Sequence, residues 1–164
     1  MCGIAGSVNH PLPYKNIDAV MMHRGPDGQQ GFSGGNVDLY HLRLSIVDID
    51  GGAQPMHLGN RYTIIFNGEI YNHRELKVQF GLECQTNSDC ETLLLLYSKY
   101  GAAMLQHLEG MFVFVIYDKK ENSLFIARDR AGKKPLYIFH NGQEIVFASE
   151  LNCLKSLLPL EMDR

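Results

Sequence analysis

The residue with the most unusual chemistry in this chain is Cys2, which follows the first methionine in the stretch MCGIAGSV. If Met1 is removed, which a small second residue permits, the thiol and a free α-amino group belong to the same residue. An α-amine titrates near pKa 7.7–8.0, well below the roughly 10.4 of lysine, so part of it is free base near neutral pH. The amine can take the proton of its own thiol, which makes this residue a nucleophile with its own base. The alternative is a small core cysteine at the start of a strand.

A thiol that attacks a carbonyl needs hydrogen-bond donors for the oxyanion that develops, and Asn67-Gly68 offers two. The pair follows the apolar run YTIIF at 62–66, which predicts a buried strand ending at this point. A side-chain amide and an unhindered backbone N–H are adjacent there. The alternative is a hairpin turn, since Asn-Gly is a common turn pair. The residues that follow, Glu69 to Asn72, do not form an immediate return strand, which weakens that alternative.

Two charged residues of opposite sign are candidates for binding a substrate. Arg43 lies in VDLYHLRLSIV at 37–47, where the alternation predicts a strand and puts Arg43 on a face with His41 and Ser45. Its guanidinium could hold a carboxylate bidentately. Asp89 follows Ser88 at a predicted helix start and could accept an ammonium group; the alternative is a favourable charge in a first helical turn. One thiol, one cation and one anion together suit an α-amino acid.

Periodicity and turn residues predict the elements that must position these side chains. We expect strands at 2–8, 37–47, 62–66, 110–118, 123–129, 135–140 and 144–149, and helices at 14–22, 73–81, 88–100 and 102–108. Asn72 and Ser88 are predicted N-caps, and Ser88 with Glu91 has the spacing of a capping box. Two central helices with strands before and after favour an α+β domain, and hairpin spacing predicts antiparallel strands near the end.

The composition is that of an ordinary globular protein. The length of 164 residues predicts one domain, and 45% hydrophobic with 20% charged residues argues against disorder. A net charge of −3 gives no reason to expect nucleic acid or an anionic membrane as partner. The apolar runs are of strand length, and the N-terminus lacks the features of a secretory signal. We therefore expect a cytoplasmic protein with no nucleic-acid or membrane partner.

The cysteines and histidines give no sign of a metal site or a disulfide framework. Cysteines stand at 2, 84, 90 and 153 without a C-x-x-C pair, and the 7 histidines include no H-x-x-x-H. Every cysteine except Cys2 is best interpreted as a small buried hydrophobe. His23, His41 and His73 are predicted to be hydrogen-bonded structural residues. We expect no bound metal.

Nine motifs occur along the chain in a definite order: MCGIAGSV, HRGPDG, LRLSIVD, QPM, FNGEIYNH, SDCE, GMFVFVIYD, RDRAGKKPLY and FASE. Together they resemble the class II glutamine amidotransferase domain of glutamine-hydrolysing asparagine synthetases, from residue 2 to about residue 155. The resemblance implies an N-terminal-nucleophile hydrolase fold, which is an α/β/β/α sandwich of two antiparallel sheets between helical layers. The whole chain, residues 1–164, would then be a single domain of this type.

The resemblance also implies that Met1 is removed and that L-glutamine is hydrolysed through a thioester. The matched residues are the nucleophile Cys2, the oxyanion donors Asn67 and Gly68, the carboxylate-binding Arg43 with the backbone of Ile46 and Val47 beside it, and the acidic Glu69 and Asp89 near the substrate amine. The motifs HRGPDG and RDRAGKKPLY receive no catalytic role. They are expected to hold turns and ion pairs around the pocket, or to face the partner domain.

In the family, ammonia passes to a larger synthetase domain that binds ATP and activates aspartate. Nothing in these 164 residues resembles its nucleotide-binding loop, so no cofactor is expected in this domain, and ATP and Mg belong to the synthetase domain. We expect a C-terminally shortened piece or a stand-alone relative, with a synthetase domain or subunit as partner and homodimerisation left open. Two alternatives remain: a glutaminase serving a sugar or polysaccharide precursor, and an inactive amidotransferase-like regulatory or binding module.

Overall fold

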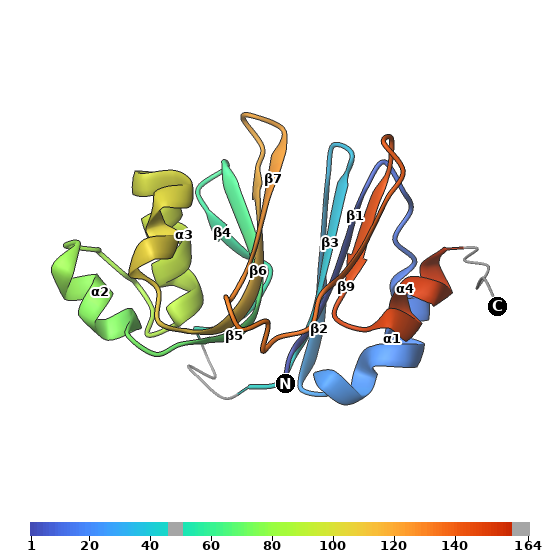
Figure 1. The fold of residues 1–164 in the computed structure, drawn as a ribbon, viewed down its shortest axis with the longest axis horizontal. Coiled ribbons are helices and arrows are strands. Elements are labelled where there is room, and N and C mark those ends of the chain that lie inside the picture. The colour runs from blue at the N-terminus through green and yellow to red at the C-terminus, as the bar shows by residue number, and fades with distance from the viewer. Residues whose placement is uncertain (46–50, 159–164) are drawn as a thin grey trace. The chain divides into compact units, whose positions relative to one another are not determined.

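The computed structural model describes residues 1–45 and 51–158 and divides into two compact units (Figure 1). The first unit consists of Met1–Leu44 and Pro135–Arg164, and the second of Ser45–Lys134. Each unit contains one antiparallel sheet with helices packed on one face. Within the described residues, no helix is long and apolar enough to cross a membrane.

The sheet of the first unit has five strands in the order β2-β3-β1-β9-β8. Its strands are β1 (Gly3–Val8), β2 (Gly28–Gly34), β3 (Val37–Arg43), β8 (Tyr137–His140) and β9 (Ile145–Ala148), and its helices are α1 (Tyr14–Met21), the short 3-10 helix η1 (Met22–Arg24) and α4 (Leu151–Leu157). Strand β1 pairs with both β3 and β9, so the first strand of the chain is internal to the sheet. Ile17 and Met21 of α1 and Leu154 of α4 share a buried cluster with Leu42 and Val146 of the sheet.

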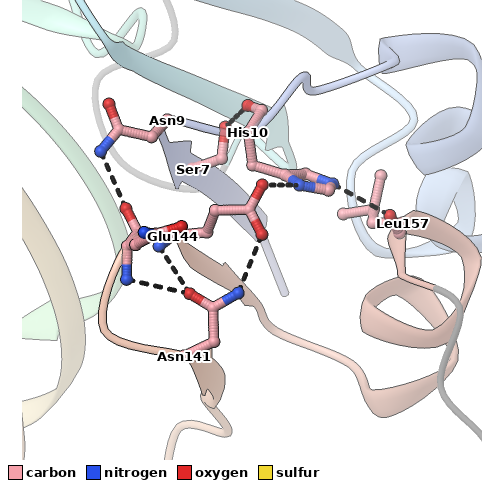
Figure 2. Close-up of polar contacts among 7 residues, drawn as sticks. Ser7, Asn9, His10, Asn141, Glu144 and Leu157 are labelled. Carbon is pink, nitrogen blue, oxygen red and sulfur yellow. Dashed lines mark hydrogen bonds and ion pairs between the residues drawn. The ribbon is translucent and has the colours of Figure 1, made fainter.

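A polar cluster connects the end of β1, the β8–β9 turn and the end of α4 (Figure 2). His10 Nδ1 lies 3.1 Å from Glu144 Oε1, and His10 Nε2 lies 3.1 Å from the carbonyl oxygen of Leu157. Asn141 donates to the other Glu144 oxygen over 3.0 Å. These hydrogen bonds lower the pKa of the Glu144 carboxyl, the one from His10 most strongly. The cluster therefore ties the last helix of this unit to its first strand.

The sheet of the second unit has four strands in sequential order, β4-β5-β6-β7. The strands are β4 (Met56–Leu58), β5 (Tyr62–Ile70), β6 (Gly110–Asp118) and β7 (Ser123–Arg128), and the helices are α2 (His73–Gln79), α3 (Asp89–Tyr100) and the 3-10 helix η2 (Gly101–His107). Leu93, Leu94 and Leu96 of α3 share a core with Phe66 and Phe114 of the sheet. This core fixes β5 and the start of α3, which carry four of the predicted site residues.

The predicted class, α+β with two antiparallel sheets, is confirmed. Four elements were not predicted: η1, β2, β4 and α4. Strand β2 reads GQQGFSG, which has no apolar alternation, and it is extended because β3 pairs with it over its whole length. The strand predicted at 37–47 ends earlier, at Arg43, and its positions 46 and 47 lie outside the described residues.

The predicted cap of α3 is half right. Ser88 is its N-cap, and Ser88 Oγ accepts a hydrogen bond from the backbone N–H of Cys90 over 3.2 Å. Glu91 does not complete a capping box, because its carboxylate accepts from the backbone N–H groups of Gln85 and Thr86 over 2.9 and 2.7 Å. The Glu91 carboxylate therefore closes the loop before the helix, and the Ser88 hydroxyl caps the helix.

The predicted N-cap position of α2 is confirmed, but the Asn72 side chain does not cap the helix. Asn72 precedes the helix, but its side chain makes no cap hydrogen bond. It donates instead to the carbonyl oxygen of His107 over 2.9 Å and accepts from the N–H of Glu109 over 3.0 Å. Asn72 thus ties the start of α2 to the segment that enters β6, a long-range contact that local spacing does not reveal.

Candidate active site

The predicted site residues fall in both units. The first unit holds Cys2 and Arg43, the second holds Asn67, Gly68, Glu69 and Asp89, and Ile46 and Val47 lie outside the described residues.

Cys2 directly precedes β1 and is held at both its main chain and its side chain. The backbone N–H of Leu44 donates to Cys2 Sγ over 3.4 Å, and the thiol lies 3.6 Å from the Leu44 carbonyl oxygen. The Cys2 carbonyl accepts a hydrogen bond from Arg24 Nε over 3.0 Å. Gly3 pairs with Leu42, so the start of β1 lies beside the end of β3. The structure thus brings Cys2 to the strand end that carries Arg43.

Arg43 is the last residue of β3, and the HRGPDG segment braces its backbone. The Arg43 carbonyl accepts from the N–H of Asp27 over 3.0 Å, and Pro26 forms an isolated bridge with Arg43. Gly25 approaches the backbone of Leu42 so closely that a Cβ there would collide with its carbonyl group. HRGPDG therefore holds a turn against the strand that carries Arg43, as predicted.

Asn67 and Gly68 lie inside a strand, so the predicted strand end at Phe66 and the hairpin alternative are both wrong. Strand β5 continues to Ile70, with Asn67 opposite Val113 and Gly68 opposite Phe112 of β6. A Cβ at Gly68 would collide with the carbonyl oxygen of Met111. The glycine is thus required by the close approach of β6, and it leaves the backbone beside Asn67 unhindered.

The Asn67 side chain has an unsatisfied donor. The residue is 1% exposed, and within the described parts of the chain its Nδ2 meets no hydrogen-bond acceptor. Burying an unpaired donor costs on the order of 1–3 kcal/mol. An amide donor held unpaired beside a glycine is what stabilisation of an oxyanion requires, because its partner arrives only with the reacting substrate. The buried, unpaired amide of Asn67 therefore suits the oxyanion-donor role that was predicted for it.

Glu69 and Asp89 are brought together, because both line one pocket of about 350 Å³ in the second unit. Asp89 is 6% exposed, and its Oδ2 accepts from the backbone N–H of Ile70 over 3.0 Å. His73 and Arg74 also line this pocket. With Glu75, three carboxylates line the pocket, which suits a positively charged group such as an ammonium.

Burial shifts the pKa of two residues that line this pocket, Asp89 and His73. Burial raises the pKa of Asp89, although the hydrogen bond from Ile70 and the nearby His73 oppose the shift. Burial lowers the pKa of His73, and Asp89 opposes that shift. The Nδ1 of His73 is buried and meets no partner among the residues that the structure describes, which the prediction of a hydrogen-bonded structural histidine did not anticipate.

The RDRAGKKPLY segment holds a turn through Asp129. The carboxylate accepts from the backbone N–H groups of Phe112 and Lys133 over 3.1 and 3.0 Å. Burial alone would raise the pKa of Asp129, but these hydrogen bonds outweigh it and lower the pKa. A pocket of about 810 Å³ lies beside this turn, and none of the predicted site residues lines it. The segment holds a turn, which is the one part of its predicted role that these contacts confirm.

Sequence reasoning missed two charged residues that meet next to Cys2. Arg24, whose Nε donates to the Cys2 carbonyl, also donates through Nη1 to Glu150 Oε1 over 3.1 Å. The two residues are 126 positions apart, so no local pattern connects them. Their one signal was that each belongs to a recognised motif, Arg24 to HRGPDG and Glu150 to FASE.

The two antiparallel sheets and their helices define an α+β fold that can be compared with solved structures. Glutamine phosphoribosylpyrophosphate amidotransferase from Bacillus subtilis matches 95% of this chain and 43% of its own, with a TM-score of 0.75. The sequences are 24% identical, so this likeness shows the fold alone.

The family is shown by the sequence itself: a model of the glutamine amidotransferase domain matches residues 1–164, and the chain belongs to this family. It is 40% identical over 148 residues to asparagine synthetase B [glutamine-hydrolyzing] of Escherichia coli (strain K12), covering 88% of this chain and 26% of that protein. It is 39% identical over 176 residues to asparagine synthetase [glutamine-hydrolyzing] 1 of Bacillus subtilis (strain 168), covering 99% and 27%. The chain thus spans about a quarter of these relatives. The predicted family is confirmed.

Proposed function

We propose that this domain hydrolyses L-glutamine to glutamate and ammonia through a thioester on Cys2. Family membership over residues 1–164 supports the reaction class. The observation that carries the proposal is the position of Cys2, whose sulfur and carbonyl are each held by a hydrogen bond at the start of an internal strand. A residue fixed in this way presents its thiol and, after loss of Met1, its amine in a constant geometry.

The first half of the reaction forms the thioester. The α-amine of Cys2 takes the thiol proton, and the sulfur attacks the side-chain amide carbon of glutamine. As the sulfur–carbon bond forms, the carbonyl electrons move to oxygen, where Asn67 Nδ2 and the Gly68 N–H donate to the oxyanion. The α-ammonium then protonates the amide nitrogen. The carbon–nitrogen bond breaks, ammonia leaves, and a γ-glutamyl thioester remains.

The second half hydrolyses the thioester with the same groups. The Cys2 amine removes a proton from water, and the oxygen of that water attacks the thioester carbon. Asn67 and Gly68 again donate to the oxyanion. The carbon–sulfur bond then breaks, the sulfur leaves with the electron pair and regains its proton from the α-ammonium, and glutamate is released. No group outside the domain is needed for this proton transfer.

The proposal assigns the charged residues to the two ends of the amino acid. Arg43 holds the α-carboxylate, for which its forked guanidinium is suited. Glu69 and Asp89, which line one pocket, hold the α-ammonium. The backbone of Ile46 and Val47 is assigned to the carboxylate side on the resemblance alone. Recognition of both charges would select an α-amino acid over a simple amide.

The ammonia acceptor that we propose is a synthetase domain or subunit that amidates aspartate with ATP and Mg. Support comes from the relatives, which are named glutamine-hydrolysing asparagine synthetases and extend well beyond the quarter that this chain matches. We place the domain in the cytosol, where its four free cysteines would stay reduced. Homodimerisation stays a prediction, as does the absence of any cofactor in this domain.

The decisive experiment is intact-mass measurement before and after treatment with an electrophilic glutamine analogue. The expected masses are those of a chain without Met1 and, after treatment, of that chain with one adduct, which peptide mapping places on Cys2. A chain that keeps Met1, takes no adduct and releases no glutamate from glutamine would instead be a regulatory or binding module. Glutaminase activity that a synthetase partner cannot couple to asparagine formation would indicate another acceptor, such as a sugar.

Replacing Asp89 by asparagine is expected to weaken glutamine binding and to stabilise the fold at neutral pH. The variant loses a charged partner of the ammonium, so KM should rise about 10- to 100-fold. Asparagine keeps an oxygen for the Ile70 N–H, and it removes a carboxylate whose pKa is raised by burial. Glutaminase kinetics and thermal melts measure the two effects.

The stability gain should depend on pH in a defined direction. The folded-state pKa of Asp89 lies above its ordinary value of 3.8, so wild type loses relative stability as pH rises through the folded pKa. The advantage of Asp89→Asn is therefore full above the folded pKa and absent below about pH 3.8. A difference in Tm that is constant from pH 4 to pH 8 would contradict this account. Glu75→Gln, a change of the same kind at another residue of this pocket, is the control.

A further inference from the structure

The proposed mechanism leaves the QPM motif without a role, and the structure places its glutamine against the strand that carries the oxyanion donors. Gln54 is 9% exposed, and its Oε1 accepts a hydrogen bond from the backbone N–H of Phe66 over 2.6 Å. Phe66 is itself 3% exposed and directly precedes Asn67 on β5. A buried side chain 12 positions away thus holds the main chain one residue before the proposed oxyanion donors.

This acceptor is needed because the pairing of β4 with β5 stops too early to supply one. Strand β4 begins at Met56, which lies opposite Ile64 of β5. Continued in the same register, β4 would place Gln54 opposite Phe66, but Pro55 intervenes and has no N–H for the ladder. The side-chain oxygen of Gln54 therefore takes the place that a backbone carbonyl of a longer β4 would fill.

The same edge of β5 is bound by a second side chain four residues further on. Asp89 Oδ2 accepts from the N–H of Ile70 over 3.0 Å, and Asp89 is 6% exposed. Successive N–H groups of a strand alternate between its two edges, so Phe66, Gly68 and Ile70 direct theirs toward one edge. Buried side chains bind the first and the last of these three N–H groups, and the Gly68 N–H lies between them.

The pairing on the other side of β5 agrees with this direction of the Gly68 N–H. Gly68 lies opposite Phe112 of β6. The N–H and the carbonyl of Phe112 point away from β5, since they bond the carboxylate and the N–H of Asp129 over 3.1 and 2.9 Å. Gly68 and Phe112 therefore form a non-hydrogen-bonded pair. The Gly68 N–H points to the edge of β5 that β4 leaves uncovered past Ile64.

We propose that Gln54 is a positioning residue for the oxyanion hole: by binding the Phe66 N–H, it holds the uncovered edge of β5 so that Asn67 and Gly68 keep their donors available to the substrate oxygen. This inference rests on the proposed function of Asn67 and Gly68. Without the Gln54 oxygen, the buried Phe66 N–H would lack an acceptor, and the strand would shift or admit water to satisfy it. Gln54 acts through the strand and not on the reacting atoms.

The effect of Gln54 should appear in kcat and not in KM. Oxyanion donors act on charge that develops only in the transition state, so disturbing them leaves glutamine binding nearly unchanged. Asp89, which holds the other end of this edge, is also assigned to the substrate ammonium, so its variants change KM as well. Gln54 is therefore the residue whose replacement reports on the position of the strand by itself.

The test compares Gln54→Met and Gln54→Glu with wild type in steady-state glutaminase kinetics of the mature chain. Methionine is similar in length but offers only a weakly accepting sulfur, so kcat should fall about 10- to 100-fold with KM within about threefold. Glutamate keeps an acceptor oxygen at the same reach and should hold kcat within about threefold of wild type. Gln54→Asn draws the amide back by one methylene and should be slowed like Gln54→Met. It carries the comparison if the methionine variant does not fold.

A second readout separates positioning of the oxyanion donors from a merely structural role. The Cys2 thiol adds to the carbonyl carbon of a γ-aldehyde analogue of glutamine, and the thiol proton passes to the oxygen, which then lies at the oxyanion position. The inhibition constant of this analogue should rise in parallel with the fall in kcat of Gln54→Met. Iodoacetamide alkylates the same thiol by displacing iodide and develops no oxyanion, so its rate should change less than about threefold.

Thr63→Val is the matched control for loss of a buried hydrogen bond on the same strand. Thr63 is 0% exposed, and its hydroxyl lies 2.9 Å from His57 Nδ1. Its kcat should stay within about twofold of wild type. Thermal melts confirm that each variant compared is folded.

Three results would overturn the inference. The first is a folded Gln54→Met variant with wild-type kcat, and the second is a Gln54→Glu variant as slow as Gln54→Met. The third is a fall in kcat without a matching rise in the inhibition constant of the aldehyde. If wild type itself takes no adduct on Cys2 and releases no glutamate, the proposed function fails, and the inference fails with it. An active wild type with unaffected variants refutes the positioning role alone.

Discussion

Replacing Cys2 by alanine is expected to abolish glutamate release, lowering kcat by at least about 10⁴-fold, while the domain remains folded. The variant removes the only thiol that can form the proposed thioester, and a small second residue still permits loss of Met1. The free amine therefore remains, so the loss reports on the nucleophile and not on processing. Release of glutamate from glutamine, measured against intact mass, checks the result.

The fold should tolerate this change because Cys2 is only partly buried and lies outside β1. The hydrogen bond from Arg24 reaches its main chain, which alanine keeps, and the substitution removes only the hydrogen bonds between the sulfur and Leu44. Cys153→Ala serves as a comparison, since it removes a fully buried thiol from the core of the same unit. That control should lower Tm and leave the glutaminase reaction intact. A Cys2→Ala variant with full glutaminase activity would contradict the proposed thioester on Cys2.

Replacing Asn67 by alanine should lower kcat about 100- to 1,000-fold, because one of two oxyanion donors is lost. Gly68 keeps its N–H, so a residual rate should remain. KM should change little, since the donor acts on charge that develops only in the transition state. Steady-state glutaminase kinetics measure both quantities.

The stability of the Asn67→Ala variant tests whether the Asn67 amide nitrogen is buried without a hydrogen-bond acceptor. The Asn67 amide nitrogen is buried without an acceptor among the described residues, so removing it relieves an unpaired donor while leaving a small cavity. The two effects oppose each other, and Tm should shift only slightly. Thr63→Ala, on the same strand and similarly buried, removes a hydroxyl that lies 2.9 Å from His57 Nδ1 and should be the more destabilising change. Near-normal kcat in a folded Asn67→Ala variant would contradict the role in oxyanion stabilisation.

The elements that sequence predicted best are those with strong apolar patterns. GMFVFVIYD and SLFIARD became β6 and β7, and the helix after Ser88 became α3. Strand β2 escaped prediction because glycine, glutamine and serine carry no signal of a strand, and its extension comes from pairing with β3. The same dependence on a neighbour explains why the Asn67-Gly68 turn signal failed. Strand β6 offers nine consecutive partners to β5, and that pairing overrides the local preference for a turn.

The residues of the candidate site also differ in how far the sequence alone could predict them. Cys2 and the Asn67-Gly68 pair could be found because their chemistry is visible in one or two adjacent residues. The pairing of Glu69 with Asp89 at one pocket, and of Arg24 with Glu150, depends on contacts between distant segments. Such contacts exist only in the folded chain, and no spacing rule predicts them. The unpaired donor on Asn67 is likewise a property of its surroundings and not of the residue.

Strand β1 lies between β3 and β9, and β9 begins at Ile145. A growing chain emerges from the ribosome at about 5–20 residues per second, so on the order of ten seconds separate the appearance of Cys2 from that of its second neighbour. During that interval the start of the chain has only half of its sheet and lacks Glu150. The proposed function requires the loss of Met1, and an aminopeptidase can reach the terminus during that interval. The order of synthesis thus lets this proposed maturation precede the pairing of β1 with β9.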